Sequence, residues 1–145
     1  MPVKGFQIIA IEAKRHNKAR PQSQVRIDHN TTIISVKSNT KNEISVEIRY
    51  TVSYGLLGIV QLDCEVKYSE KEDLTEAVKK WELKHKLADN IAEAVHNKVL
   101  AQGSFEVLNI AKKMNLPPPF KIEIPQIKIG KGEEKKNKNN SPEIA

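Results

Sequence analysis

The sequence predicts an α+β fold: a four-stranded antiparallel sheet with helices packed on one of its faces. In residues 43–54 and 60–68, apolar and polar side chains alternate without a break, which is typical of strands with one buried face. Residues 69–102 then contain no proline or glycine, and their apolar residues recur at helical spacing. Strands followed by helices, in a chain without a fixed repeat, favour an antiparallel sheet over an alternating α/β fold.

The length and composition of the chain indicate one globular domain. Its 145 residues fall within the usual size of a domain with a single core. The only cysteine, Cys64, excludes an internal disulfide, and no apolar run is long enough for a signal peptide or a membrane span. We therefore expect a cytoplasmic protein without membrane insertion, with one domain at 1–129 and a disordered polar tail at 130–145.

The first two strands are expected at residues 5–13 and 24–37. The first strand is rich in isoleucine. In the second strand, the apolar positions keep one parity as far as Ile33 and change it at Ile34. A change of parity by one residue is what a β-bulge produces, so a bulge is predicted at this point.

The two clearest strands are joined by a short stretch with glycine at both ends, residues 55–58, which predicts an antiparallel hairpin. A register that places Tyr54 opposite Val60 keeps the apolar residues of both strands on one face. This register also brings Arg49 opposite Glu65. Opposite charges across an exposed face add roughly a few tenths of a kcal/mol, so the apolar match decides the prediction.

Helices are expected over residues 69–102 and again over residues 104–115. Capping residues near 87–90 are compatible with a break in the first run. Gly103 is predicted to end that run, because glycine commonly follows the last turn of a helix. In the helix that follows, Phe105 is expected to point inward.

The segment at 116–129 is predicted to be an apolar arm. Three successive prolines favour an extended approach, and Phe120, Ile122 and Ile124 then share one face. Pro125 has no N–H to donate to a ladder, so the arm requires a sheet edge or an excursion. We expect it to lie on the surface, in a groove of its own domain or on a neighbouring subunit.

No residue pattern predicts catalysis, a cofactor or a metal. The four histidines show no ligand spacing, and none is adjacent to the cysteine. Cys64 falls in the apolar phase of its strand, where a cysteine acts as a small buried hydrophobe. The sequence has no phosphate-binding loop and no nucleophile-elbow motif. An enzyme is therefore not expected.

The net charge of +6 favours acidic partners, including nucleic acid. The densest basic cluster contains Lys14, Arg15, Lys18 and Arg20, although such clusters are also common in solvated loops. The three tyrosines fall in the apolar phase of their strands, so they are not expected to stack on bases. A nucleic-acid-binding or ribonucleoprotein accessory module is the alternative function.

Several large apolar side chains fall where a polar residue would be usual. Leu56 and Leu57 lie at the tip of the predicted hairpin, Trp81 lies in a strongly charged helix, and Phe120 lies in the arm. Exposed apolar patches mark binding surfaces or oligomer contacts. The alternative is that these side chains complete the core.

These elements, read with their residues, resemble the protein-export chaperone SecB. In that family, long antiparallel strands lead through a crossover stretch into a helix that ends in a Gly-Thr-Phe-like turn. The stretch AEAVHNKVLAQGSF, residues 92–105, is similar to that helix and turn, and VEIRYTVSY with LDCEVKY is similar to the two central strands. The resemblance covers roughly residues 6–120.

The resemblance implies a holdase, which is a chaperone that keeps unfolded polypeptide in apolar grooves without ATP. It also implies a role in protein export and assembly as a homotetramer, a dimer of dimers. Carried onto this chain, the client-binding residues are Leu56, Leu57, Trp81, Phe120, Ile122 and Ile124. The oligomer interface consists of Ile8, Ile9, Ile11, Ile91, Val95 and Val99.

Two features depart from the family pattern. The family's acidic surface docks the SecA motor, whereas this chain is basic. The charge argues against SecA coupling and favours a stand-alone chaperone or an archaeal-type relative. The expected crossover at 71–86 is charged and helix-like rather than an apolar loop, which argues against an identical groove. An ATP-independent chaperone is the leading hypothesis.

Overall fold

The computed structural model describes residues 3–16 and 25–120. It contains one four-stranded sheet, two α-helices and a short 3-10 turn. The elements are β1 Val3–Arg15, β2 Asp28–Thr40, β3 Glu43–Ser53, η1 Gly55–Leu57, β4 Gly58–Ser69, α1 Thr75–Lys84 and α2 Asp89–Lys113. The strands lie in the order β1-β4-β3-β2, and each neighbouring pair is antiparallel. The predicted α+β fold is therefore confirmed.

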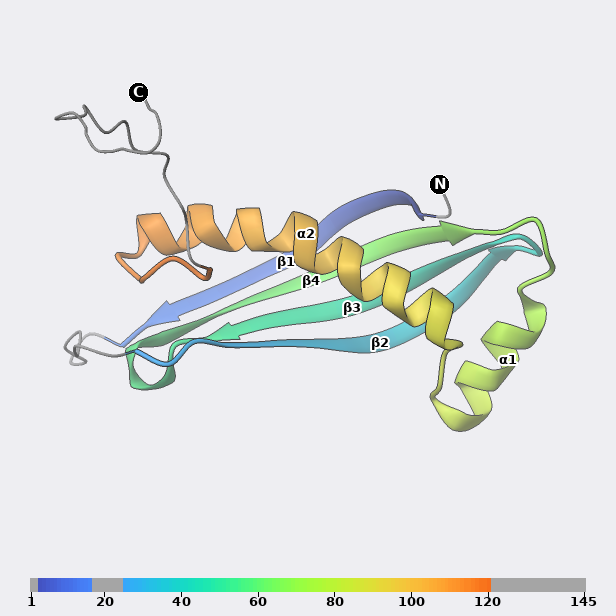
Figure 1. Cartoon of the computed structure of the whole chain (residues 1–145), viewed down its shortest axis with the longest axis horizontal. Helices are drawn as coiled ribbons and strands as arrows, with labels where there is room; N and C mark the ends of the chain where they lie inside the picture. The colour runs from blue at the N-terminus through green and yellow to red at the C-terminus, as the bar shows by residue number, and fades with distance from the viewer. Residues whose placement is uncertain (1–2, 17–24, 121–145) are drawn as a thin grey trace, which may run out of the picture.

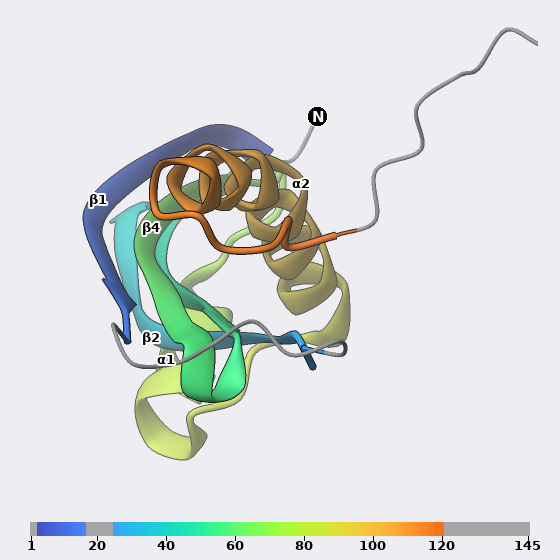
Figure 2. The same ribbon diagram turned by 90° about the vertical axis from the view of Figure 1, so that its left-hand side faces the viewer.

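The molecule has two layers, a curled sheet and a long helix that crosses its concave face (Figures 1 and 2). In the first half of α2, His96 lies 2.7 Å from the hydroxyl of Thr31 on β2. Just beyond its end, the carbonyl of Asn115 accepts a bond of 2.6 Å from Arg15 on β1. The helix therefore runs diagonally from one edge strand to the other, while α1 packs near β2.

The core lies between the sheet and the helices because one face of each central strand is apolar. Its members on β3 and β4 are buried almost completely: Ile44, Val46, Ile48, Tyr50, Val52, Val60, Leu62, Cys64, Val66 and Tyr68. From α2, the buried residues recur every four positions: Ile91, Val95, Val99, Gly103, Val107 and Ala111. The alternation on β3 and β4 places polar residues on the opposite face of the sheet.

The predicted bulge in β2 is confirmed. The register shifts between Ile33 and Ser35, which leaves Ile34 as the extra residue. Val36 consequently returns to the core face, where it is buried. The register of β1 also shifts between Ile8 and Ala10, which leaves Ile9 as an extra residue on that strand.

The β3–β4 hairpin differs by two residues from the predicted register. Val52, and not Tyr54, lies opposite Val60. The turn explains the difference, because the N–H of Tyr54 donates to the carbonyl of Gly58 at 2.9 Å and the three residues between them form η1. A shift of two residues leaves every side chain on its own face. The alternation of apolar residues could therefore not separate the two registers.

The charge pairing predicted for this hairpin was wrong for the same reason. Arg49 lies opposite Asp63 and not Glu65, and the two side chains form an ion pair of 2.8 Å. Glu47 then lies opposite Glu65, an arrangement of like charges. Exposed pairs of either kind change stability by only about 1 kcal/mol or less, which is too little to move the register against the turn.

A break between two helices is found, as the capping residues suggested, at residues 85–88. His85 adopts the left-handed conformation with a φ of 54°, and its N–H donates to the carbonyl of Trp81 at 2.7 Å. This arrangement closes α1 and turns the chain. At the other end of α1, the carboxylate of Asp73 accepts a bond of 2.8 Å from the N–H of Thr75.

Gly103 does not end a helix, contrary to the prediction. α2 continues through it to Lys113, so the helix expected at 104–115 is the second half of α2. Gly103 is buried against β3, and a Cβ atom at this position would lie 2.9 Å from the ring of Tyr50. Glycine is needed here for close packing of the helix on the sheet, and not for a turn.

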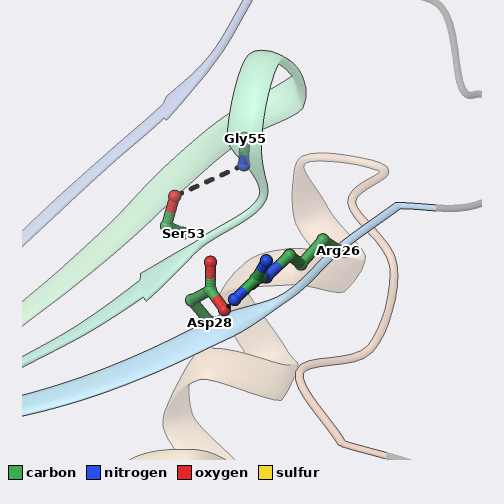
Figure 3. A network of polar contacts seen from close by, with 4 residues as sticks. All are labelled: Arg26, Asp28, Ser53 and Gly55. Atoms are coloured by element: carbon green, nitrogen blue, oxygen red, sulfur yellow. Dashed lines mark hydrogen bonds and ion pairs between the residues drawn. The ribbon is translucent and has the colours of Figure 1, made fainter.

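The crossover of this fold lies between β1 and β2. These strands follow one another along the chain but form opposite edges of the sheet. Where the chain reaches β2, Arg26 and Asp28 form an exposed ion pair of 3.0 Å (Figure 3). Nearby, the N–H of Gly55 donates to the hydroxyl of Ser53 at 3.3 Å in the β3–β4 turn. The later segment that the sequence assigned to the crossover instead forms α1.

The residues that follow α2 extend the cover of the core. Leu116 and Pro119 are buried, and Nε2 of His29 on β2 donates to the carbonyl of Pro119 at 2.7 Å. They are the first part of the predicted arm. Ile122, Ile124 and the predicted polar tail lie outside the described residues.

Candidate functional site

The described part of the chain leaves several large apolar side chains exposed, and this surface is available to a partner. Within 3–16 and 25–120, no three His, Cys, Asp or Glu side chains gather as metal ligands would. Cys64 is buried, and this burial raises the pKa of its thiol to about 11. The reactive thiolate is therefore scarce at neutral pH. In the same part of the chain, no helix combines the length and apolar character needed to span a membrane.

The two leucines of the hairpin tip have opposite environments. Leu56 is 84% exposed, whereas Leu57 is only 4% exposed and belongs to the core. The turn η1 causes this difference, because it points successive side chains in different directions. The carbonyl of Leu57 also accepts a bond of 3.1 Å from the N–H of His16. Of the two predicted client contacts at this tip, only Leu56 is available, and the prediction for Leu57 was wrong.

Trp81 lies far from this tip. Its indole is half-buried against the core and meets the ring of His85 edge to face, with a centroid distance of 5.4 Å. Figure 1 shows α1 and the β3–β4 turn at opposite ends of the sheet. The eleven residues of β3 separate these ends by about 35 Å. The structure therefore does not bring Trp81 and Leu56 together in one groove.

Phe120 contacts a residue that the sequence had placed in the core. Its ring lies edge to face against Phe105, with centroids 5.9 Å apart. Phe105 is 64% exposed on the outer side of α2, although it was expected to point inward. The four-residue stripe that continues through Gly103 was the signal that could have placed it outside. Phe105 and Phe120 together form an aromatic pair at the surface.

The residues predicted for an oligomer interface fall into two groups. Ile91, Val95 and Val99 are buried between α2 and the sheet of their own domain, so assigning them to a subunit contact was wrong. Ile9 and Ile11 are each more than half exposed on the edge strand β1. Ile8 is half-buried and packs against the core. Of the residues predicted for the interface, only those on the edge strand β1 expose apolar surface to another subunit.

A chain of polar contacts ties the start of the predicted arm to the sheet. The hydroxyl of Tyr50 lies 2.7 Å from Nδ1 of His29, and Nε2 of the same ring lies 2.7 Å from the carbonyl of Pro119. Because a carbonyl only accepts, Nε2 carries the hydrogen. In the neutral ring Nδ1 then accepts from the tyrosine hydroxyl, whose pKa burial raises to about 12. Each donor among these three groups therefore faces an acceptor.

The basic cluster is only partly within the described residues. Lys14 is exposed, and Arg15 uses its guanidinium to bind the carbonyl of Asn115 at 2.6 Å. Lys18 and Arg20 lie outside the described residues. All three tyrosines of the chain are buried, so none offers a face on which a base could stack.

Comparisons with known proteins place the fold. No family model matches the chain, and no curated protein matches it. Among solved structures, the Mycobacterium tuberculosis Rv1957 SecB-like chaperone, in complex with a ChAD peptide from the Rv1956 HigA1 antitoxin, has a similar fold. The two share 12% sequence identity with a TM-score of 0.58, and the match covers 86% of this chain and 88% of that chain. At this identity the likeness establishes a SecB-like fold.

Proposed function

We propose that this protein is an ATP-independent chaperone that holds unfolded or extended polypeptide on exposed apolar surface. The observation that carries the proposal is the SecB-like fold, shared over most of both chains with a chaperone whose structure contains a bound peptide. Within this fold, large apolar side chains remain in water on the turn, on α1 and on α2. Such surface on a small domain is typical of a protein that binds other polypeptides.

The aromatic pair of Phe105 and Phe120 is the strongest single contact surface for a client. Aromatic rings bury a large apolar area on binding and adapt to many sequences. Leu56, on the turn between β3 and β4, offers a second contact. Distributed contacts of this kind suit an extended client, because each makes a modest contribution and no unique sequence is required.

Assembly is part of the proposal. We infer that the protein works as a homotetramer, a dimer of dimers, in which the edge strand β1 forms a subunit contact through Ile9 and Ile11. The net charge of +6 favours association with acidic clients and raises their encounter rates.

The test is the aggregation of a chemically denatured client enzyme, followed by light scattering without ATP. The wild-type protein is expected to suppress scattering at a stoichiometric ratio. Phe105→Ser should weaken this protection several-fold, whereas Asn109→Ser, an exposed position one turn further along α2, should not. If the wild-type protein gives no protection at a several-fold excess, the proposed function is wrong.

A further inference from the structure

The outer face of α1 carries a groove that neither the core nor the aromatic pair uses. The groove has a volume of about 490 Å³. Its lining comes from α1 and from the residue that precedes α2: Glu76, Ala77, Lys79, Lys80, Leu83, Lys84 and Ala88. This volume is in the range of sites that hold small ligands or a few side chains of a peptide.

The groove is built on a helix whose position is fixed from behind. On the inner side of α1, Leu74 and Val78 are buried in the core. Trp81 packs against the same core and against His85, at the corner where the chain turns toward α2. Lining positions 76, 80 and 83 have the spacing of one helix face, opposite to the buried face. The groove therefore belongs to packed elements of the fold.

The floor of the groove is apolar and its rim is basic. Leu83 is 83% exposed, which leaves a whole leucine side chain in water. Ala77 and Ala88 extend this apolar floor, and the aliphatic stems of the lysines add to it. The rim carries three lysines against one glutamate, Glu76. A ligand that fits this chemistry combines a large apolar side chain with carboxylates around it.

We propose that this groove binds acidic segments of client polypeptides, with an apolar side chain of the segment seated on Leu83 and its carboxylates facing Lys80 and Lys84. The inference rests on the proposed function and names a client class for it. Client recognition is then selective: apolar contact supplies affinity, and the lysine rim prefers acidic sequences over basic ones.

The charges favour a client over other occupants of the groove. Residues 130–145 of this chain carry four lysines and three glutamates, so this tail does not complement a basic rim. A second copy of the chain has the same excess of positive charge, so it complements a basic rim less well than an acidic segment does, and the subunit contact proposed for it uses apolar residues of β1 instead. An acidic polypeptide meets both the apolar and the electrostatic requirement of the groove.

Three fluorescein-labelled peptides of equal length test the proposal by anisotropy with the full chain. The first combines leucine and aspartate, the second has lysine in place of aspartate, and the third has serine in place of leucine. The wild-type protein is expected to bind the first about tenfold more tightly than either of the others. Leu83→Ser should reduce that affinity about tenfold. Because Leu83 is 83% exposed, this substitution removes no core contact and should leave the free energy of unfolding nearly unchanged.

A matched pair of double variants separates the groove from general charge. Lys80→Glu with Lys84→Glu is expected to weaken binding of the leucine–aspartate peptide about tenfold. Lys37→Glu with Lys67→Glu changes the net charge equally at exposed positions of β2 and β4 that do not line the groove, and should change affinity less than about twofold.

The outcomes distinguish this proposal from the proposed function. If the wild-type protein protects a denatured client but both double variants bind the acidic peptide equally, the groove proposal is overturned and the chaperone proposal stands. A groove variant that changes oligomeric mass instead of peptide affinity assigns the groove to a second copy and also overturns it. Absence of client protection and of binding to all three peptides overturns both.

Discussion

Gly103 and Tyr50 set the distance between α2 and the sheet. The tyrosine ring is fully buried beneath the helix, and its hydroxyl is held 2.7 Å from Nδ1 of His29. Because the ring is attached to β3 at one end and its hydroxyl contacts His29 at the other, it cannot move aside easily. The helix therefore approaches the sheet closely only where it lacks a Cβ atom, which is the position of Gly103.

Gly103→Ala is expected to destabilise the protein. In an ordinary helix interior this change adds about 1 kcal/mol of stability. Here the new Cβ would lie 2.9 Å from the Tyr50 ring, and overpacking of a core costs about 1–3 kcal/mol. The net expectation is a loss of about 1 kcal/mol in the free energy of unfolding, measured by urea titration. Gln102→Ala, at the exposed neighbouring position, is the control. An alanine variant more stable than wild type would show that the packing is looser than described.

His96 makes stability depend on pH. Its ring is partly buried between α2 and β2, and this burial lowers its pKa below the ordinary value of 6.5. The unfolded state consequently binds more protons just below pH 6.5, so stability falls as the pH decreases through that range. Between pH 7.5 and pH 5.5, the urea concentration at the unfolding midpoint should fall further for the wild-type protein than for His96→Gln. Equal losses in the two proteins would contradict the assignment.

At the scale of elements, α2 and the residues after it form one cover for the sheet. α2 runs diagonally, and the chain then turns back under its end (Figure 2). Leu116 enters the core there, close to Gly58 at the start of β4. The carbonyl of Pro119 is held by His29 on β2. The segment therefore spans from the central part of the sheet to its edge.

Leu116→Ala tests whether this segment is part of the stable fold. Leu116 is buried, so its truncation should cost about 2–5 kcal/mol in the free energy of unfolding. Lys112→Ala, an exposed position near the end of α2, should change it by less than about 0.5 kcal/mol. Both values come from urea unfolding followed by circular dichroism. A leucine variant as stable as the lysine variant would mean that the segment merely rests on the surface.

The elements that the sequence predicted well are those that depend on periodicity. The strand phases and the bulge at Ile34 follow from alternation, because a slip of one residue would expose the whole apolar face. The β3–β4 register did not follow, because two registers that differ by two residues bury the same side chains. The hydrogen bond of Tyr54 within the turn decides between them.

The candidate site was harder to predict, because it depends on contacts distant in sequence. If Gly103 ended one helix, a new helix would begin after it with its own apolar face, and Phe105 would point inward. As a packing residue, it preserves the phase and leaves Phe105 exposed. The separation of Leu56 from Trp81 depends on the length of the strands between them. The groove on α1 had one local signal in the sequence, because Leu83 is an apolar residue among lysines.

At the scale of the whole molecule, the two edges of the sheet are unequal. Both edge strands are thirteen residues long, but Ile9 and Ile11 on β1 are 54% and 52% exposed. On the opposite edge, β2 exposes Ile34 to only 38% and packs near α1. A long edge strand with exposed apolar residues is a ready template for pairing with another chain. Soluble proteins generally cover such an edge, and a second copy is the cover that the proposed function includes.

Ile11→Lys should therefore reduce the mass of the assembly in solution. A lysine on an edge strand opposes pairing, because its charge would have to be buried or displaced in the contact. Sedimentation velocity is expected to show a wild-type oligomer and a species of half its mass or less for Ile11→Lys. Ile34→Lys introduces the same charge on the opposite edge and should leave the mass unchanged. If the wild-type protein is a monomer at tens of micromolar, or if the two variants behave alike, β1 is not the subunit contact. If the wild-type protein is a monomer, the chaperone proposal depends on the apolar surface of a single subunit, where the turn that carries Leu56 lies about 35 Å along the sheet from α1, too far for one short client segment to contact both.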